Sequence, residues 1–115
     1  VVLDLRPKSK TFKQWFSVEL TEENNKLFYI PPGCAHGYQT LEDDSQMLYL
    51  MSQEYMIDYE KGVKYSDPSF NILFPLEVST ISKKDESWNL FEWIICLRLN
   101  ILGKNFNFRE NEFKR

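Results

Sequence analysis

The chain has 115 residues, the length of a single small domain, and a multidomain protein is not expected. Hydrophobic residues make up 43% and charged residues 27%, which excludes a disordered, collagen-like or low-complexity chain. The formal net charge of −3 argues against a nucleic-acid-binding protein, which needs a basic face. The longest apolar stretch, residues 90–102, is interrupted by charged residues and too short to cross a membrane. We therefore expect a globular domain that binds neither nucleic acid nor membranes.

The cysteines and the start of the chain bear on its location. Cys34 and Cys96 lie far apart and form neither a zinc-binding set nor a disulfide framework. Because the first residues do not read as a signal peptide, the sequence predicts a reduced, cytoplasmic protein. An apolar run occupies residues 1–5 without an initiator methionine or a preceding turn, so we expect the sequence to begin within a domain.

Short segments of alternating apolar and polar residues, separated by turn clusters, predict a β-rich fold. The segments that we expect to form strands are 1–5, 14–20, 27–30, 36–41, 47–55, 62–65 and 72–74. In the longest of them, Met47, Tyr49 and Met51 share one face while Leu48 and Leu50 share the other. Many short strands joined by regular turns are typical of a sandwich, jelly roll or barrel.

The end of the chain has a different pattern. Apolar residues recur at helical spacing between Leu90 and Leu97, which predicts a short helix near the C-terminus. Beyond Gly103 the sequence is rich in asparagine and charge, and we expect this tail to fray.

The stretch at residues 29–38 is the most informative for chemistry. A strand ends there at Pro31-Pro32-Gly33, and His36 begins the next strand. On an all-β scaffold this arrangement aims the imidazole along the mouth of a barrel or into its lumen. His36 is the one histidine of the sequence, and neither a glycine-rich phosphate loop nor a serine nucleophile elbow is present. These residues alone leave a functional and a structural histidine equally open.

Several motifs carry a resemblance to a known family. They include Asp4-Leu5-Arg6, Thr11-Phe12, Ile30-Pro31-Pro32-Gly33, Ala35-His36-Gly37, Asp67-Pro68 and Ser82-Lys83-Lys84-Asp85. In order and spacing they resemble the C-terminal half of the dTDP-4-dehydrorhamnose 3,5-epimerases, sugar-nucleotide epimerases of the cupin superfamily. The resemblance implies an all-β, cupin-type double-stranded β-helix (jelly roll), here partial, with a short C-terminal helix. It makes residues 1–88 the C-terminal part of an epimerase-like cupin domain. Residues 89–115 are the C-terminal helix and tail, and the resemblance gives no counterpart for residues 91–115.

The resemblance also implies a reaction, the epimerisation of a dTDP-4-keto-6-deoxyhexose in deoxysugar biosynthesis of the dTDP-rhamnose type. A histidine abstracts a proton next to the C4 ketone, and a tyrosine returns one from the opposite face. No metal or other cofactor is required. The catalytic positions that the resemblance implies are Tyr49, the proton donor, and Asp85, which orients the base histidine. The substrate-binding positions that it implies are His36, Tyr55, which stacks on thymine, Glu60 and Lys84.

This sequence also departs from the family pattern. The family's base lies in an Arg-Gly-x-His segment before the part that this chain resembles, so we expect a truncated chain with little or no activity alone. Its unpaired strand edges predict a homodimer. A non-catalytic cupin remnant that binds a sugar nucleotide or a partner chain is an alternative. A third possibility is a single-position epimerase or isomerase acting on another nucleotide.

Overall fold

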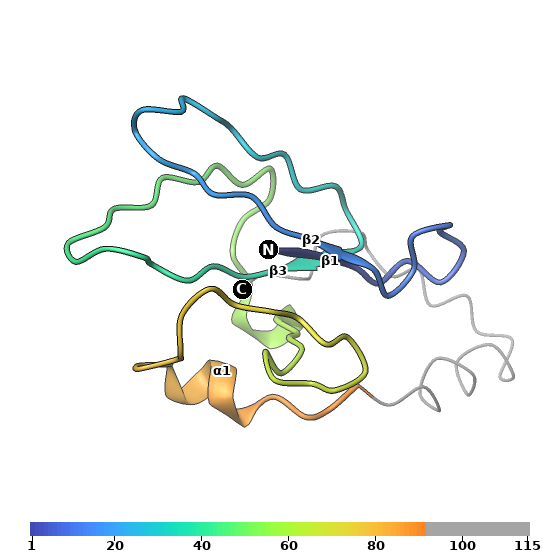
Figure 1. Ribbon diagram of the computed structural model, residues 1–115. Coiled ribbons are helices and arrows are strands. Elements are labelled where there is room, and N and C mark those ends of the chain that lie inside the picture. The colour runs from blue at the N-terminus through green and yellow to red at the C-terminus, as the bar shows by residue number, and fades with distance from the viewer. Residues whose placement is uncertain (92–115) are drawn as a thin grey trace, which may run out of the picture.

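The structure is a computed structural model, and it describes residues 1–91. Its strands are β1 (Val2–Asp4), β2 (Trp15–Phe16) and β3 (Cys34–His36). A 3-10 helix, η1 (Ile57–Tyr59), and an α-helix, α1 (Lys83–Ser87), follow. Figure 1 shows the strands together in one sheet, with α1 set apart from it. The described part of the chain is thus a small antiparallel sheet with little helix, as an all-β family predicts.

The sheet is built around β1, in the order β2-β1-β3, and both pairings are antiparallel. Val2 lies opposite Phe16 on one side and His36 on the other. The N-terminal amino group donates to the Gly37 carbonyl at 3.0 Å, which extends the β1–β3 pairing by a residue. The strand expected over residues 1–5 is confirmed as β1, because its apolar run has a hydrogen-bonded partner on both edges.

The hydrophobic core lies under one face of this sheet. Leu3, Leu5 and Phe70 are buried, and the partly buried residues packed against them are Trp15, Ala35, Val63, Ile72 and Phe91. In Figure 1 the segment after residue 60 runs beneath the sheet, and its Phe70 belongs to the same buried cluster as Leu3 of β1. Buried Asp67 accepts hydrogen bonds from the backbone N–H groups of Ser69 and Phe91, and so fastens residue 91 to the core.

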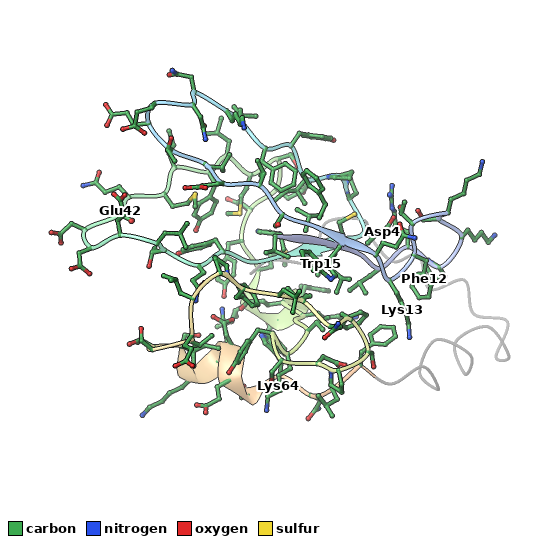
Figure 2. The ribbon with its side chains drawn as sticks, in the orientation of Figure 1. Asp4, Phe12, Lys13, Trp15, Glu42 and Lys64 are labelled. Carbon is green, nitrogen blue, oxygen red and sulfur yellow. The ribbon has the colours of Figure 1, made fainter. Side chains whose placement is uncertain are left out.

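The buried carboxylate of Asp4, the last residue of β1, accepts several hydrogen bonds at the end of the sheet. Asp4 accepts hydrogen bonds from the Arg6 guanidinium at 2.8 and 3.0 Å, and from the Ser9 and Thr11 hydroxyls at 2.6 Å each. Figure 2 shows Asp4 beside the loop that carries Phe12. The Arg6 side chain also covers Gly33, where a Cβ atom would lie 2.6 Å from Arg6 Cγ and φ is +80°. Only glycine suits that position.

Several expected strands do not form. Residues 27–30, 47–55, 62–65 and 72–74 contain no strand in the structure, and the strand expected over 14–20 is reduced to β2. The strand expected over 36–41 instead ends at His36 as β3. In Figure 1 residues 17–33 and 37–56 form two long excursions away from the sheet. A strand requires a ladder of backbone hydrogen bonds to a neighbouring strand, and no such ladder includes these segments within residues 1–91.

The alternation expected in residues 47–51 is nevertheless present. Tyr49 is 48% exposed, whereas Leu48 and Leu50 are 88% and 91% exposed. The two faces of this segment therefore differ as predicted, although no ladder joins it to the sheet.

The expected C-terminal helix lies mostly outside the described residues. Leu90 and Phe91, at its start, are not helical, and the observed helix α1 lies earlier, at Lys83–Ser87. Within residues 1–91 no helix is long and apolar enough to cross a membrane.

Candidate functional site

Three of the residues expected to bind substrate meet in one cluster. Glu60 comes directly after η1, and its carboxylate accepts a hydrogen bond from the Tyr55 hydroxyl at 2.9 Å. Its other oxygen accepts from the ammonium of Lys84 at 2.6 Å, across 24 residues of sequence. The hydrogen bond to Glu60 is the main cause that raises the pKa of Lys84 above its usual value. Glu60 therefore joins the η1 segment to α1.

The exposure of these three residues differs sharply. The side chain of Glu60 is 5% exposed, while that of Lys84 is 41% exposed and Tyr55 is 52% exposed. An incoming molecule can therefore reach the aromatic ring and the ammonium, but hardly the carboxylate between them.

Helix α1 is held in place by close packing against a glycine. Trp88 caps the C-terminus of α1, and its indole lies so close to Gly62 that a Cβ atom there would be 2.2 Å away. Glycine at position 62 thus allows α1 to approach the segment that carries Glu60. At the other end, the Ser82 hydroxyl accepts from the Asp85 backbone N–H at 3.0 Å, an ordinary N-cap.

One carboxylate oxygen of Asp85 accepts a hydrogen bond, and the other has no donor within residues 1–91. Its Oδ2 accepts a hydrogen bond from the Ser82 hydroxyl at 2.7 Å. Its Oδ1 is buried, and no donor reaches it from residues 1–91. Buried carboxylate oxygens nearly always have a donor, so this atom is suited to accept one more hydrogen bond.

The two remaining predicted site residues lie on other elements. His36 ends β3 and is half-buried, and it alternates with Ala35, which packs on the core. Tyr49 lies in the excursion formed by residues 37–56, on the same face as Met47 and Met51. The structure thus brings Tyr55, Glu60 and Lys84 into contact and places Asp85 beside them on α1.

The chemistry of the cluster suits a nucleotide. A half-exposed tyrosine ring offers a flat π face to an aromatic base. An ammonium that uses one N–H on Glu60 has others to donate to a phosphate. Within residues 1–91 no group of three or more His, Cys, Asp or Glu could hold a metal ion. Sequence reasoning missed the packing of Trp88 on Gly62, for which the glycine itself was the available signal.

Comparison with known proteins gives a consistent result. A family model described as dTDP-4-dehydrorhamnose 3,5-epimerase matches residues 1–92. The dTDP-4-dehydrorhamnose 3,5-epimerase of Methanothermobacter thermautotrophicus is 38% identical over 91 residues, covering 76% of this chain and 49% of that protein. Its namesake from Shigella flexneri is 38% identical over 85 residues, covering 74% and 47%. Its namesake from Sinorhizobium fredii is 35% identical over 88 residues, covering 76% and 45%.

No solved structure matches the chain significantly. The chain spans about half the length of the curated relatives that it matches. The family match covers most of the chain and includes every residue of the site described above. The chain therefore belongs to the dTDP-4-dehydrorhamnose 3,5-epimerase family.

Proposed function

We propose that this chain supplies the proton-donating and nucleotide-binding part of an enzyme that epimerises a dTDP-4-keto-6-deoxyhexose. The observation that carries the proposal is the cluster of Tyr55, Glu60 and Lys84. Thymine would stack on the Tyr55 ring, and the diphosphate would accept hydrogen bonds from Lys84. This geometry fits the substrate that the names of the relatives imply.

The reaction needs a base, an acid and a donor to the developing oxyanion. Removing a proton next to the C4 ketone creates an enolate, whose oxygen is stabilised by hydrogen-bond donors such as the His36 imidazole. The Tyr49 hydroxyl would then return a proton to carbon. The open Oδ1 of Asp85 would accept the N–H of the base imidazole and favour its charged form. Because His36 is the one histidine of this sequence, that base would come from outside its 115 residues.

The finer features of the fold belong to the same proposal. Residues 1–88 would form part of a cupin jelly roll, in which the excursions pair with further strands, and residues 89–115 would be an appended segment. The nearly complete exposure of Leu48 and Leu50 supports such pairing and supports a homodimer. A reducing, cytoplasmic location belongs to the same proposal, supported by the wide separation of Cys34 and Cys96 in the sequence.

A chimera tests the proposal. The chain is fused to the part of the Methanothermobacter thermautotrophicus enzyme that it does not match, and epimerisation of dTDP-4-keto-6-deoxyglucose is measured. We expect turnover in the chimera and a loss on the order of a hundredfold in its Tyr49→Phe variant. Phe keeps the ring, and Tyr29→Phe, in the other excursion, is the matched control. A folded chimera with no turnover, or one unaffected by Tyr49→Phe, would contradict the proposal.

The single histidine also favours a second candidate function. A chain without a second imidazole could act as a sugar-nucleotide-binding domain that performs no chemistry. In that case it would bind dTDP, and its chimera would fold without gaining turnover.

A further inference from the structure

We infer that Phe91 is a positioning residue that anchors helix α1, and with it the two predicted site residues of that helix. Those residues are Lys84 and Asp85. The inference rests on the proposed function, because Phe91 acts on the nucleotide only through them and makes no contact with it. It goes beyond the proposed function in making a residue outside the cluster necessary for the geometry of the cluster.

Helix α1 has little of its own to fix its position. It is five residues long, and none of them is buried. A helix this short is unstable alone in water, and most helical stability comes from packing of an apolar face. The ammonium of its ion pair with Glu60 is 41% exposed, and exposed ion pairs contribute little by themselves. The position of α1 therefore depends on contacts made by the residues on either side of it.

Phe91 is joined to the core through both its backbone and its ring. Its backbone N–H donates to Asp67, which is 2% exposed and also accepts from the N–H of Ser69. Its ring meets Phe70 edge-on, with 5.2 Å between the centroids, and packs on the hydrophobic core under the sheet. Phe91 comes four residues after Ser87, the last residue of α1, so this anchor restrains the end of the helix.

Lys13 adds a cation over the Phe91 ring. Its ammonium lies 5.0 Å from the centroid of Phe91 and 6.0 Å from that of Phe70, within range of a cation–π interaction. Figure 2 shows Lys13 pointing from the loop after β1 toward the part of the molecule beneath the sheet. Its φ of +65° is one that residues other than glycine rarely adopt. Its N–H donates to the Asp4 carbonyl at 2.8 Å, so β1 holds this backbone in place.

Phe91 and Trp88 restrain the same end of α1. The Trp88 indole lies against Gly62, and Phe91 contacts the same segment, residues 60–70. In Figure 1 the chain leaving α1 runs alongside this segment. Without the Phe91 ring, α1 would spend part of its time away from the position in which Lys84 is paired. Affinity for the nucleotide falls in proportion to the fraction that is lost.

Binding of dTDP to the whole chain, measured by titration calorimetry, tests the inference. Phe91→Ala removes the ring and keeps the N–H that Asp67 accepts. We expect its dissociation constant for dTDP to rise on the order of tenfold, which corresponds to α1 being in place about a tenth of the time. Leu90→Ala is the matched control, because Leu90 is the adjacent apolar residue and is 53% exposed. Its affinity should equal that of the parent chain.

Amide hydrogen exchange separates a positioning role from a general loss of stability. The Glu86 amide donates to the Ser82 carbonyl at α1, and the Asp4 amide of β1 donates to the Gln14 carbonyl. Local release of α1 predicts that Phe91→Ala exchanges faster at Glu86, on the order of tenfold or more, with a smaller change at Asp4. An equal acceleration at both amides would mean that Phe91 only stabilises the whole domain, and it would overturn the inference.

Parent-like affinity in Phe91→Ala, with a parent chain that binds dTDP, would overturn the inference and leave the proposed function standing. If Phe91→Ala does not fold, Lys13→Met decides in its place, because it removes the cation and keeps the rings. We expect it to weaken dTDP binding on the order of threefold relative to Lys10→Met, an exposed lysine of the same loop. Equal affinity in these two variants would overturn the inference. A parent chain that does not bind dTDP would overturn the proposed function, and exchange at Glu86 would then decide the anchoring of α1.

Discussion

Replacing Asp4 by Asn removes the negative charge of the carboxylate that accepts the hydrogen bonds at the end of β1. Asp4 is 6% exposed, with Oδ1 accepting from the backbone N–H and Nε of Arg6. Its Oδ2 accepts from Arg6 Nη2 and from the hydroxyls of Ser9 and Thr11. An asparagine amide places an NH2 group against donors in either orientation. We expect unfolding free energy to fall by about 2–4 kcal/mol, because one hydrogen bond to a charged group contributes about 1.5–3 kcal/mol.

Urea denaturation followed by tryptophan fluorescence measures this loss, since Trp15 packs against the same sheet. Asp43→Asn is the matched control, because Asp43 is exposed in a turn and its replacement should change stability by less than about 0.5 kcal/mol. The reasoning is refuted if Asp4→Asn and Asp43→Asn unfold at the same urea concentration.

The pH dependence follows from the same carboxylate. Its hydrogen bond from Arg6, aided by Ser9 and Thr11, holds the pKa of Asp4 well below its usual range. A carboxylate with a depressed folded-state pKa adds stability above its unfolded pKa of about 3.9 and loses it as the pH falls further. The stability difference between the parent and Asp4→Asn should therefore be full at pH 6 and shrink below about pH 4. A difference that stays constant down to pH 2.5 would contradict this assignment.

Two further predictions concern the site. Gly62→Ala should displace the Trp88 indole, which a Cβ atom would meet at 2.2 Å, and shift its fluorescence, while Gly37→Ala, with open space around it, should not. The chain alone should not catalyse solvent-deuterium exchange into dTDP-4-keto-6-deoxyglucose above the buffer rate, since His36 is its one histidine and is assigned to substrate binding. Exchange at the rate of an intact family member would show that the base has been misplaced.

The alternation of apolar and polar residues predicted some strands correctly and others wrongly. The apolar run at residues 1–5 predicted β1, and the alternation around Tyr49 predicted two faces, which do differ in exposure. Neither pattern shows which segments pair. Pairing depends on contacts distant in sequence, and residues 47–55 therefore remained without a ladder where a strand was expected.

For the candidate site, too, the sequence predicted which residues take part but not how they contact one another. Resemblance alone selected Tyr55, Glu60 and Lys84 as substrate-binding positions, but it did not show that they contact one another. That Glu60 is buried and bridges the other two depends on how closely α1 approaches η1, across 24 residues of sequence. The approach depends in turn on Gly62 beneath Trp88, a packing detail that periodicity does not encode.

The most direct test of the proposed function is a titration of the isotope-labelled chain with dTDP, observed by NMR at the Tyr55 ring and at Lys84 Nζ. The account predicts saturable shifts at both positions with a single dissociation constant. Inorganic phosphate should shift Lys84 and leave the Tyr55 ring unchanged, because it offers no base to stack. Saturation with dTDP that leaves both Tyr55 and Lys84 unshifted, or no binding at all, would contradict the claim that this cluster holds the nucleotide.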